Sequence, residues 1–300
     1  MARFGHVVTA MVTPFDATGA LDVDGARTLA RWLQDNGNDG LVVAGTTGEA
    51  PTLSDDEKLT LWAAVAEAVT IPVVAGAGSN DTAHSVHLTR EASKLGVAGI
   101  LAVGPYYNRP SQAGIAGHFR AVCAATDLPV MLYDIPIRTG RKVATATLLR
   151  LADEIPNLVA LKDAAGNPGE TASVIARAGA GFEVYSGDDS MTLPLLAVGA
   201  VGVVGVATAW TGVDHQELFA CWAKGDVDGA RAINARLLES FSFETGDEAP
   251  NPIPTKAMLR TLGLPAGQCR LPMGDAPDWV EPRAQEVWAN LQRARGAAQA

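Results

Sequence analysis

The sequence predicts an α/β protein, a closed (β/α)8 TIM barrel over residues 1–212, followed over 213–300 by a barrel-closing helix and a C-terminal helical extension. Three observations predict this fold. Eight short apolar runs have strand character, helical stretches separate them, and the whole set fits into about 210 residues, which allows one crossover helix for each strand. An open, doubly wound sheet is the structural alternative.

The apolar runs are rich in Val, Ile and Leu, and Gly or Pro marks many of their ends. Parallel strands that are covered on both faces have this uninterrupted apolar character, whereas half-exposed strands alternate. We therefore expect eight buried strands. They are residues 7–13, 41–45, 73–78, 98–104, 129–134, 158–163, 182–187 and 202–208.

Helical stretches lie between these runs. SDDEKLTLWAAVAEAV begins at Ser54 and has Glu57 three positions later, the spacing of a capping box. DTAHSVHLTREASKLG, residues 81–96, is predicted to be a helix that ends at a glycine. From about residue 213 the strand pattern stops, and four further helices are predicted in the extension. They cover residues 214–225, 226–241, 254–263 and 277–296.

The composition excludes several classes of function. The chain of 300 residues has a formal net charge of -10, so its field repels nucleic acid and anionic membranes. We find neither a signal-peptide pattern nor an apolar stretch of the roughly 18 residues that a membrane span requires. The three cysteines are far apart and form no CxxC pair, which indicates neither disulfides nor a zinc site. We expect a soluble, cytoplasmic protein without a metal.

Lys162 lies at the end of the sixth apolar run, where barrel enzymes place their chemistry. Side chains alternate along a strand, so Ala160 and Lys162 are predicted to face the lumen, and Val159 and Leu161 the helices. Partial burial there lowers the pKa of a lysine, and a neutral amine attacks carbonyl groups to form a Schiff base. The alternative is a structural ion pair with Asp163 or another carboxylate.

Four further residues at the predicted barrel mouth suit a reaction on a carboxylate substrate. Tyr133 ends the adjacent strand with the same parity as Lys162, and its phenol could transfer a proton; the alternative is a core tyrosine with a satisfied hydroxyl. Thr46 and Thr47 lie in a Gly-flanked turn whose hydroxyl and N–H groups can hold a small carboxylate. The guanidinium of Arg138 suits a second carboxylate, unless it is a surface arginine.

Other polar groups have simpler interpretations. Asp188 and Asp189 precede a predicted helix, and we interpret both as N-terminal caps in preference to metal ligands. His84 and His87 are three positions apart on a predicted helix and are expected to be solvated. The glycines of GAVGVVGVA indicate close backbone approach at the eighth strand.

Six motifs together are similar to the dihydrodipicolinate synthase family, over nearly the whole chain and in the same order. The resemblance implies a class I lyase that condenses pyruvate with L-aspartate 4-semialdehyde through a Schiff base, in lysine and diaminopimelate biosynthesis, without a cofactor. It also implies a homotetramer built from dimers. The motifs are GTTGE (45–49), PYYNRPSQ (105–112), YDIPIRTG (133–140), LKDA (161–164), SGDD (186–189) and NPIPTKAMLRTLG (251–263).

Five positions match the family's catalytic set, so their roles are implied by the resemblance. Lys162 matches the lysine that forms the imine. Thr46 and Thr47 match the pair that holds the carboxylate of pyruvate. Tyr133 matches the tyrosine that relays protons together with Thr46 and Tyr107. In the family, the tyrosine at the position of Tyr107 reaches across a dimer interface to complete the relay of the neighbouring subunit.

The remaining matches concern the walls of the site. Arg138 matches the arginine that binds the carboxylate of the semialdehyde. Gly187 and Val204 fall where backbone groups line the site. Gly205 is a departure, since many relatives carry a serine there.

The regulatory pocket differs more strongly. In relatives that lysine inhibits, one Glu and two His line a pocket at a subunit interface, and the matching positions here are His84, Asp55 and Lys58. Asn80 and Tyr106 are retained. Because the partner for the amine of lysine is missing and Lys58 adds a like charge, we expect weak or absent inhibition by lysine.

Two alternative functions stay open at this point. The first is another pyruvate-dependent aldolase of the same barrel type, such as N-acetylneuraminate lyase or a keto-deoxy sugar-acid aldolase. Arg138 and the GTTG pair favour the synthase, because a short semialdehyde needs a partner for its carboxylate whereas a polyol needs partners for its hydroxyls. The second is a barrel that binds a keto acid without catalysis.

Overall fold

Eight parallel strands close into a barrel in the computed structural model, which describes residues 2–298. Each strand pairs with the next along the chain, and β8 closes the ring on β1. This order confirms the barrel and excludes the doubly wound sheet. The strands are β1 (Val7–Ala10), β2 (Gly40–Val43), β3 (Val73–Gly76), β4 (Gly99–Val103), β5 (Val130–Asp134), β6 (Leu158–Asp163), β7 (Glu183–Ser186) and β8 (Gly202–Gly205).

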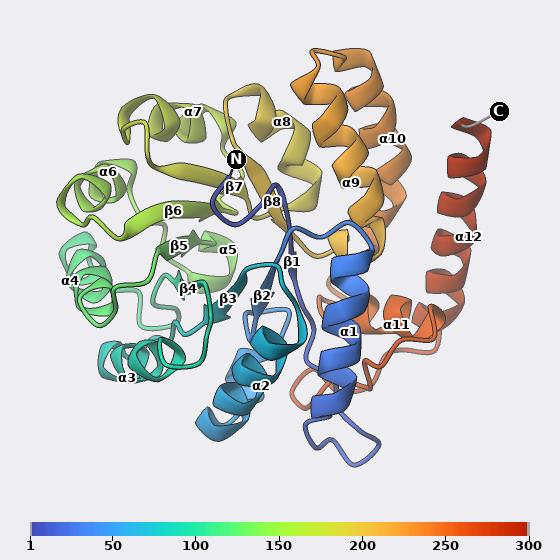
Figure 1. The fold of residues 1–300 in the computed structure, drawn as a ribbon, viewed down its shortest axis with the longest axis horizontal. Helices are drawn as coiled ribbons and strands as arrows, with labels where there is room; N and C mark the ends of the chain where they lie inside the picture. Colours follow the sequence, from blue (N-terminus) through green and yellow to red (C-terminus); the bar gives the residue numbers. More distant parts are fainter. Residues whose placement is uncertain (1, 299–300) are drawn as a thin grey trace.

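Helices form a ring around the strands (Figure 1). A short helix and two 3₁₀ turns lie in the loops that follow β2, β5 and β7: η1 (Ala50–Thr52), α5 (Pro136–Thr139) and η2 (Asp189–Met191). The outer helices are α1 (Val23–Asp35), α2 (Asp55–Ala68), α3 (Thr82–Ala92), α4 (Gln112–Cys123), α6 (Thr145–Glu154), α7 (Pro168–Arg177), α8 (Thr192–Ala197) and α9 (Thr208–Ala223).

The C-terminal part consists of α10 (Val227–Phe243), α11 (Ile253–Thr261) and α12 (Val280–Ala298), and α12 packs against both α10 and α11. The red α12 lies at the edge of the molecule in Figure 1. The expected boundary at 212/213 falls inside α9, one residue after Thr211, whose backbone is not helical. The division of the chain into two domains therefore stays a prediction.

The helix signals are mostly confirmed. Ser54 and Glu57 form the predicted capping box at the start of α2, since each side chain accepts a hydrogen bond from the backbone of the other. The helix predicted over residues 81–96 ends earlier, at Ala92, and Gly96 adopts a positive φ of 76° in the turn beyond it. The local sequence thus predicts the starts of these helices more closely than their ends.

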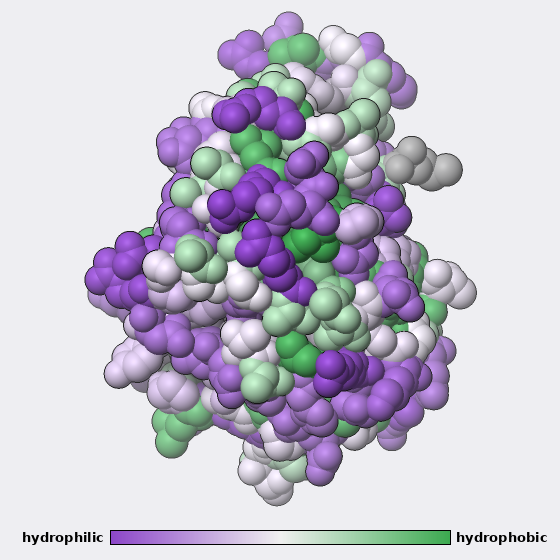
Figure 2. Space-filling view, turned by 90° about the vertical axis from the view of Figure 1, so that its left-hand side faces the viewer, coloured by the Kyte–Doolittle hydropathy of each residue, from purple (hydrophilic) through white to green (hydrophobic). Residues whose placement is uncertain are grey.

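Two apolar clusters hold the fold together. One fills the space between the strands and the helices, and the other fills the interior of the barrel. On the side of the molecule that Figure 2 turns toward the viewer, apolar residues form small, separated patches among polar ones. The buried interior cluster comprises Phe4, Val8, Val42, Val74, Leu101, Met131, Tyr133, Ile135, Ala160, Tyr185 and Val204.

The alternation predicted for β6 is wrong at one residue. Val159 packs against the interior cluster, although its parity with Leu161 predicts a position under the helices. The register between β5 and β6 shifts at this point, because Val130 pairs with Leu158 and the next residue, Met131, pairs with Ala160. A bulge of this kind resets the side-chain alternation, and Ala160 and all later residues of the strand have the predicted orientation.

A buried ion pair ties the C-terminal part to the loop after β2. Lys256 on α11 lies 2.6 Å from the carboxylate of Glu49, and the exposed fractions of the two residues are 0% and 3%. Lys256 also donates to the carbonyl of Gln268 (2.9 Å), and the backbone N–H of Arg270 donates to Glu49 (2.9 Å). The loop that carries Thr46 and Thr47 is therefore held from the far end of the chain.

Lys256→Met is expected to lower the free energy of unfolding by about 3 to 5 kcal/mol, because the carboxylate of Glu49 stays buried without its counter-charge. Urea denaturation measures the change. A matched double variant, Lys256→Met with Glu49→Gln, removes both charges and should recover most of the loss. Equal losses in the single and the double variant would contradict an electrostatic origin.

Candidate active site

The carboxyl ends of β5 and β6 place two inward-facing side chains next to each other. Tyr133 pairs with Lys162 across the two strands, and Asp134 pairs with Asp163. Because side chains alternate, Tyr133 and Lys162 face the barrel interior while the two aspartates face outward. The Nζ atom of Lys162 lies 4.3 Å from the centroid of the Tyr133 ring.

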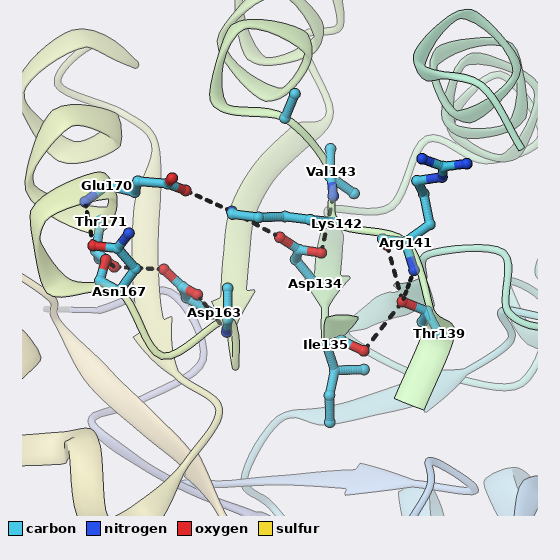
Figure 3. A network of polar contacts seen from close by, with 12 residues as sticks. Asp134, Ile135, Thr139, Arg141, Lys142, Val143, Asp163, Asn167, Glu170 and Thr171 are labelled. Carbon is cyan, nitrogen blue, oxygen red and sulfur yellow. Dashed lines mark hydrogen bonds and ion pairs between the residues drawn. The ribbon is translucent and has the colours of Figure 1, made fainter. Parts of the chain in front are cut away.

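The outward-facing aspartates anchor these strand ends, as Figure 3 shows. Lys142 lies between Asp134 (3.3 Å) and Glu170 of α7 (2.9 Å), and so links β5 to the helix that follows β6. Asp163 accepts a 2.6 Å hydrogen bond from the hydroxyl of Thr171, also on α7. Both strand ends are thus fixed on the side that faces the helices, which holds Tyr133 and Lys162 in place.

Lys162 is buried without a counter-ion. Its exposed fraction is 5%, and none of the ion pairs found among residues 2–298 involves it. Asp163, the partner in the structural alternative, is bonded to Thr171 and to the N–H of Ala165 instead. Burial lowers the pKa of Lys162 to about 8, although the neighbouring acidic groups Asp189 and Glu244 act in the opposite direction. About a tenth of the amine is then neutral at pH 7.

Tyr133 keeps its proton at neutral pH. Burial raises the pKa of the phenol to about 12, while the charge of Arg138 and the Thr46 hydroxyl beside it act to lower the pKa. A protonated phenol next to an amine can donate a proton to an oxygen atom that leaves during imine formation.

The loop after β2 depends on the C-terminal part for its geometry. Thr47 is 3% exposed, and its hydroxyl accepts a 2.9 Å hydrogen bond from the side-chain amide of Asn251. The carbonyl of that amide accepts from the hydroxyl of Thr255 (3.1 Å). Ala44 and Glu49, on either side of the pair, both have a φ near 55°. Asn251 belongs to a motif noted in the sequence, but its contact with Thr47 could not be predicted from local pattern.

A cavity of about 460 Å³ opens beside these groups. Thr46, Tyr133 and Arg138 contribute to its wall, but Lys162 and Thr47 do not. Tyr133 links the two, since its ring is part of the cavity wall and lies 4.3 Å from the Nζ atom of Lys162. The same cavity continues to all the residues expected in the regulatory pocket, namely Asp55, Lys58, Asn80, His84 and Tyr106.

The other expected site residues have diverse positions. A Cβ atom on Gly187 would lie 3.0 Å from the Cγ of Lys162, so the glycine leaves room for the lysine side chain. Val204 is fully buried in the interior cluster. Tyr107 is 89% exposed, with a φ of 72°, and a single copy of the chain does not bring its side chain to the amine. Ile137, near the cavity, is 91% exposed.

The capping prediction for the two aspartates is right for one and wrong for the other. Asp188 caps η2 by accepting from the N–H of Ser190 (2.9 Å). Asp189 is 1% exposed and accepts from the N–H of Val206 (2.7 Å), because the short turn directs its side chain into the protein. Buried Asp189 and Glu244, both near Lys162, are the functional candidates that the sequence did not indicate.

The two histidines of α3 differ. His87 is exposed as expected, whereas His84 is only half-exposed and binds the carboxylate of Asp55 at 2.9 Å. Across the described residues, no cluster of His, Cys, Asp and Glu side chains is arranged to hold a metal ion. Residues 2–298 also contain no helix with the length and hydropathy of a membrane span.

Comparison with known proteins gives one consistent result. Residues 3–290 match the dihydrodipicolinate synthetase family. The 4-hydroxy-tetrahydrodipicolinate synthase of Moorella thermoacetica is 51% identical over 90% of this chain and 92% of its own.

Two solved structures have the same fold. The enzyme from Cyanidioschyzon merolae with lysine bound is 42% identical, with a TM-score of 0.94, and covers 97% of this chain and 99% of its own. The chloride-inhibited dihydrodipicolinate synthase of Acinetobacter baumannii, complexed with pyruvate, is 32% identical with a TM-score of 0.91, over 96% of this chain and 99% of its own. The chain therefore belongs to the dihydrodipicolinate synthetase family.

Proposed function

We propose that the chain is a class I lyase that binds pyruvate as a Schiff base on Lys162 and condenses it with L-aspartate 4-semialdehyde. The product is 4-hydroxy-tetrahydrodipicolinate, in lysine and diaminopimelate biosynthesis. The observation that carries the proposal is a buried lysine without a counter-ion beside a protonated tyrosine, at the end of the barrel where chemistry occurs. The activity named for the relatives supports the same reaction.

The first half of the reaction uses the amine and the phenol. Neutral Lys162 attacks the ketone carbon of pyruvate, and the carbinolamine then loses water to give the imine. Tyr133, with Thr46 beside it, donates the proton with which the oxygen leaves. Loss of a methyl proton converts the imine to an enamine, whose carbon attacks the aldehyde. Attack by the amine of the semialdehyde then closes the ring and frees Lys162.

The two carboxylates of the substrates need separate partners. The hydroxyl and backbone N–H groups of Thr46 and Thr47 suit the carboxylate of pyruvate, which fixes the angle at which the amine attacks. Arg138, in the wall of the cavity, suits the carboxylate of the semialdehyde. The backbone at Gly187 and Val204 completes the wall near the amine.

A second copy of the chain completes the proton relay in this proposal. Tyr107 and Ile137 are large, almost fully exposed side chains, which favours their burial against another subunit. We infer a homotetramer built from dimers, in which Tyr107 of one subunit serves the site of its neighbour. The enzyme is proposed to act in the cytoplasm.

Borohydride reduction in the presence of pyruvate should attach one reduced pyruvate to the chain, because the imine on Lys162 becomes a stable amine. Peptide mass spectrometry locates the adduct. Lys162→Met should remove it, whereas the control Lys94→Met, at an exposed lysine, should not. Turnover with aspartate semialdehyde, compared with sialic acid and keto-deoxygluconate, separates this reaction from those of related aldolases. An adduct on any other lysine contradicts the assignment.

The amine of Lys162 should titrate with a midpoint near 8, because burial disfavours its charged form. Imine formation should therefore become faster as the pH rises and level off above that midpoint. NMR of protein labelled with ¹³C at the lysine ε-carbon measures the titration, and the signal absent from Lys162→Met identifies the residue. A midpoint near the ordinary value of 10.5 would show that burial does not tune the amine.

Asn251→Ala is expected to raise the KM for pyruvate about tenfold, because Thr47 loses the hydrogen bond that orients its hydroxyl. The kcat should change less. Steady-state kinetics measures both constants. Asn251→Asp keeps an acceptor for Thr255 but loses the donor to Thr47, so it should behave like the alanine variant. Asn290→Ala, which removes a surface amide bonded to Glu239, is the matched control. An unchanged KM with a lower kcat would argue against the orienting role.

L-Lysine at millimolar concentration should inhibit turnover only weakly or not at all. In the pocket, Asp55 already pairs with His84 (2.9 Å) and lies 3.8 Å from Lys58, so its negative charge is matched before any ligand enters. An added amine would also meet the like charge of Lys58. Initial rates with and without lysine test this expectation, and appreciable inhibition would refute it.

A further inference from the structure

Two buried carboxyl groups lie near Lys162. Asp189 of η2 is 1% exposed, and Glu244, the residue that caps the end of α10, is 8% exposed. α10 packs against η2, and the charge and hydrogen bonding of Asp189 both act on the carboxyl group of Glu244. Asp189 Oδ1 and Glu244 Oε2 are both fully buried, and neither receives a hydrogen bond from a donor within residues 2–298. Two acceptors in contact without a donor need a proton between them.

The surrounding groups do not supply that proton. The nearest candidate is His215 on α9, whose Nε2 lies 4.0 Å from Asp189 Oδ1, beyond hydrogen-bonding distance. The other ring nitrogen, Nδ1, lies 3.0 Å from the carbonyl of Thr211, and this contact assigns the ring proton to Nδ1. At 4.0 Å, Nε2 makes no hydrogen bond to Asp189 whether or not it carries a proton. A donor has to come from one of the two carboxyl groups themselves.

Gly205 of β8 keeps this contact free of other side chains. A Cβ atom at this position would lie 2.5 Å from Asp189 Oδ1 and 2.6 Å from the Cγ2 of Thr208. No side chain of β8 can therefore stand beside the oxygen and donate to it. The second oxygen of Asp189 is occupied, because it accepts from the N–H of Val206. This leaves Oδ1 as the acceptor for Glu244.

We propose that Asp189 and Glu244 share one proton, carried by Glu244 and donated to Asp189, so that Lys162 faces one negative charge instead of two. Glu244 is then a positioning residue, since it acts on the amine through Asp189. The functional meaning of the acid pair rests on the proposed role of Lys162 as the imine-forming amine. The protonation state of the acid pair is independent of that role.

The electrostatics of the neighbourhood agree with this arrangement. Burial, with the charges of Asp189 and Asp188 adding to it, raises the pKa of Glu244 well above its usual range. The groups that face Lys162 are the ring of Tyr133, the charge of Arg138 and the acid pair. One carboxylate offsets part of the cost of a buried ammonium. A second would raise the pKa of Lys162 and reduce the neutral fraction that attacks a ketone.

Infrared spectroscopy of the wild-type protein tests the shared proton directly. A protonated carboxyl group has a carbonyl-stretch band well separated from that of carboxylates. At pH 7 this band should be present, and it should move when the protein is labelled with ¹³C-glutamate but stay in place with ¹³C-aspartate. Absence of the band, or a shift with labelled aspartate, overturns the proposal. This measurement needs no variant and no substrate.

Titration of Lys162 in three variants tests the charge. Glu244→Gln keeps a donor to Asp189 and should leave the midpoint of Lys162 within about 0.3 units of the wild type. Glu244→Gln combined with Asp189→Asn removes the remaining charge and should lower the midpoint by about one unit or more, a tenfold rise in neutral amine. Glu248→Gln, at an exposed carboxylate of the same loop, is the matched control.

Two results contradict the proposal. A lower midpoint in Glu244→Gln alone means that Glu244 is ionised in the wild type, and an unchanged midpoint in the double variant means that the pair does not act on Lys162. Because these titrations use no pyruvate, they succeed or fail independently of the borohydride experiment. If the double variant does not fold, the infrared band and the titration of Glu244→Gln still test whether Glu244 carries the proton.

Discussion

The removal of one ammonium group from water is the constraint on which this site depends. A closed ring of strands excludes solvent from Lys162, and no carboxylate lies close enough to form an ion pair with it, so the neutral amine becomes accessible near physiological pH. The surrounding structure limits how far the pKa of Lys162 falls. The tyrosine ring and one nearby negative charge both favour the ammonium, and they keep the cost of its burial moderate.

Two separate segments of the chain hold the site rigid. Outward-facing aspartates and Lys142 fix the strand ends that carry Tyr133 and Lys162. The loop with Thr46 and Thr47 is held by the amide of Asn251, just before α11, and by the buried ammonium of Lys256 on α11. The extension is therefore part of the site, although it contributes no group to the reaction itself.

Much of this arrangement follows from local sequence, and the remainder depends on contacts between distant segments. The ends of β5 and β6 and the inward direction of Tyr133 and Lys162 follow from apolar runs and alternation, whereas β1 and β8 each end three residues before the predicted runs do. The bulge that redirects Val159 depends on the register with β5, which no single strand encodes. The local sequence predicts that Asp189 is a helix cap, but the 3₁₀ turn directs its side chain inward. No local pattern predicts its contact with Glu244, because Glu244 lies at the end of α10.

The hydrogen bond between Thr47 and Asn251 spans 204 residues of sequence, which has a consequence for biosynthesis of the chain. A ribosome exposes β2 and its loop early, and the residue that bonds to Thr47 emerges 204 residues later. A nascent barrel that has already gained all eight strands still lacks the support of the turn with Thr46 and Thr47. The geometry that we propose for binding a keto acid is thus completed only after the barrel strands have emerged.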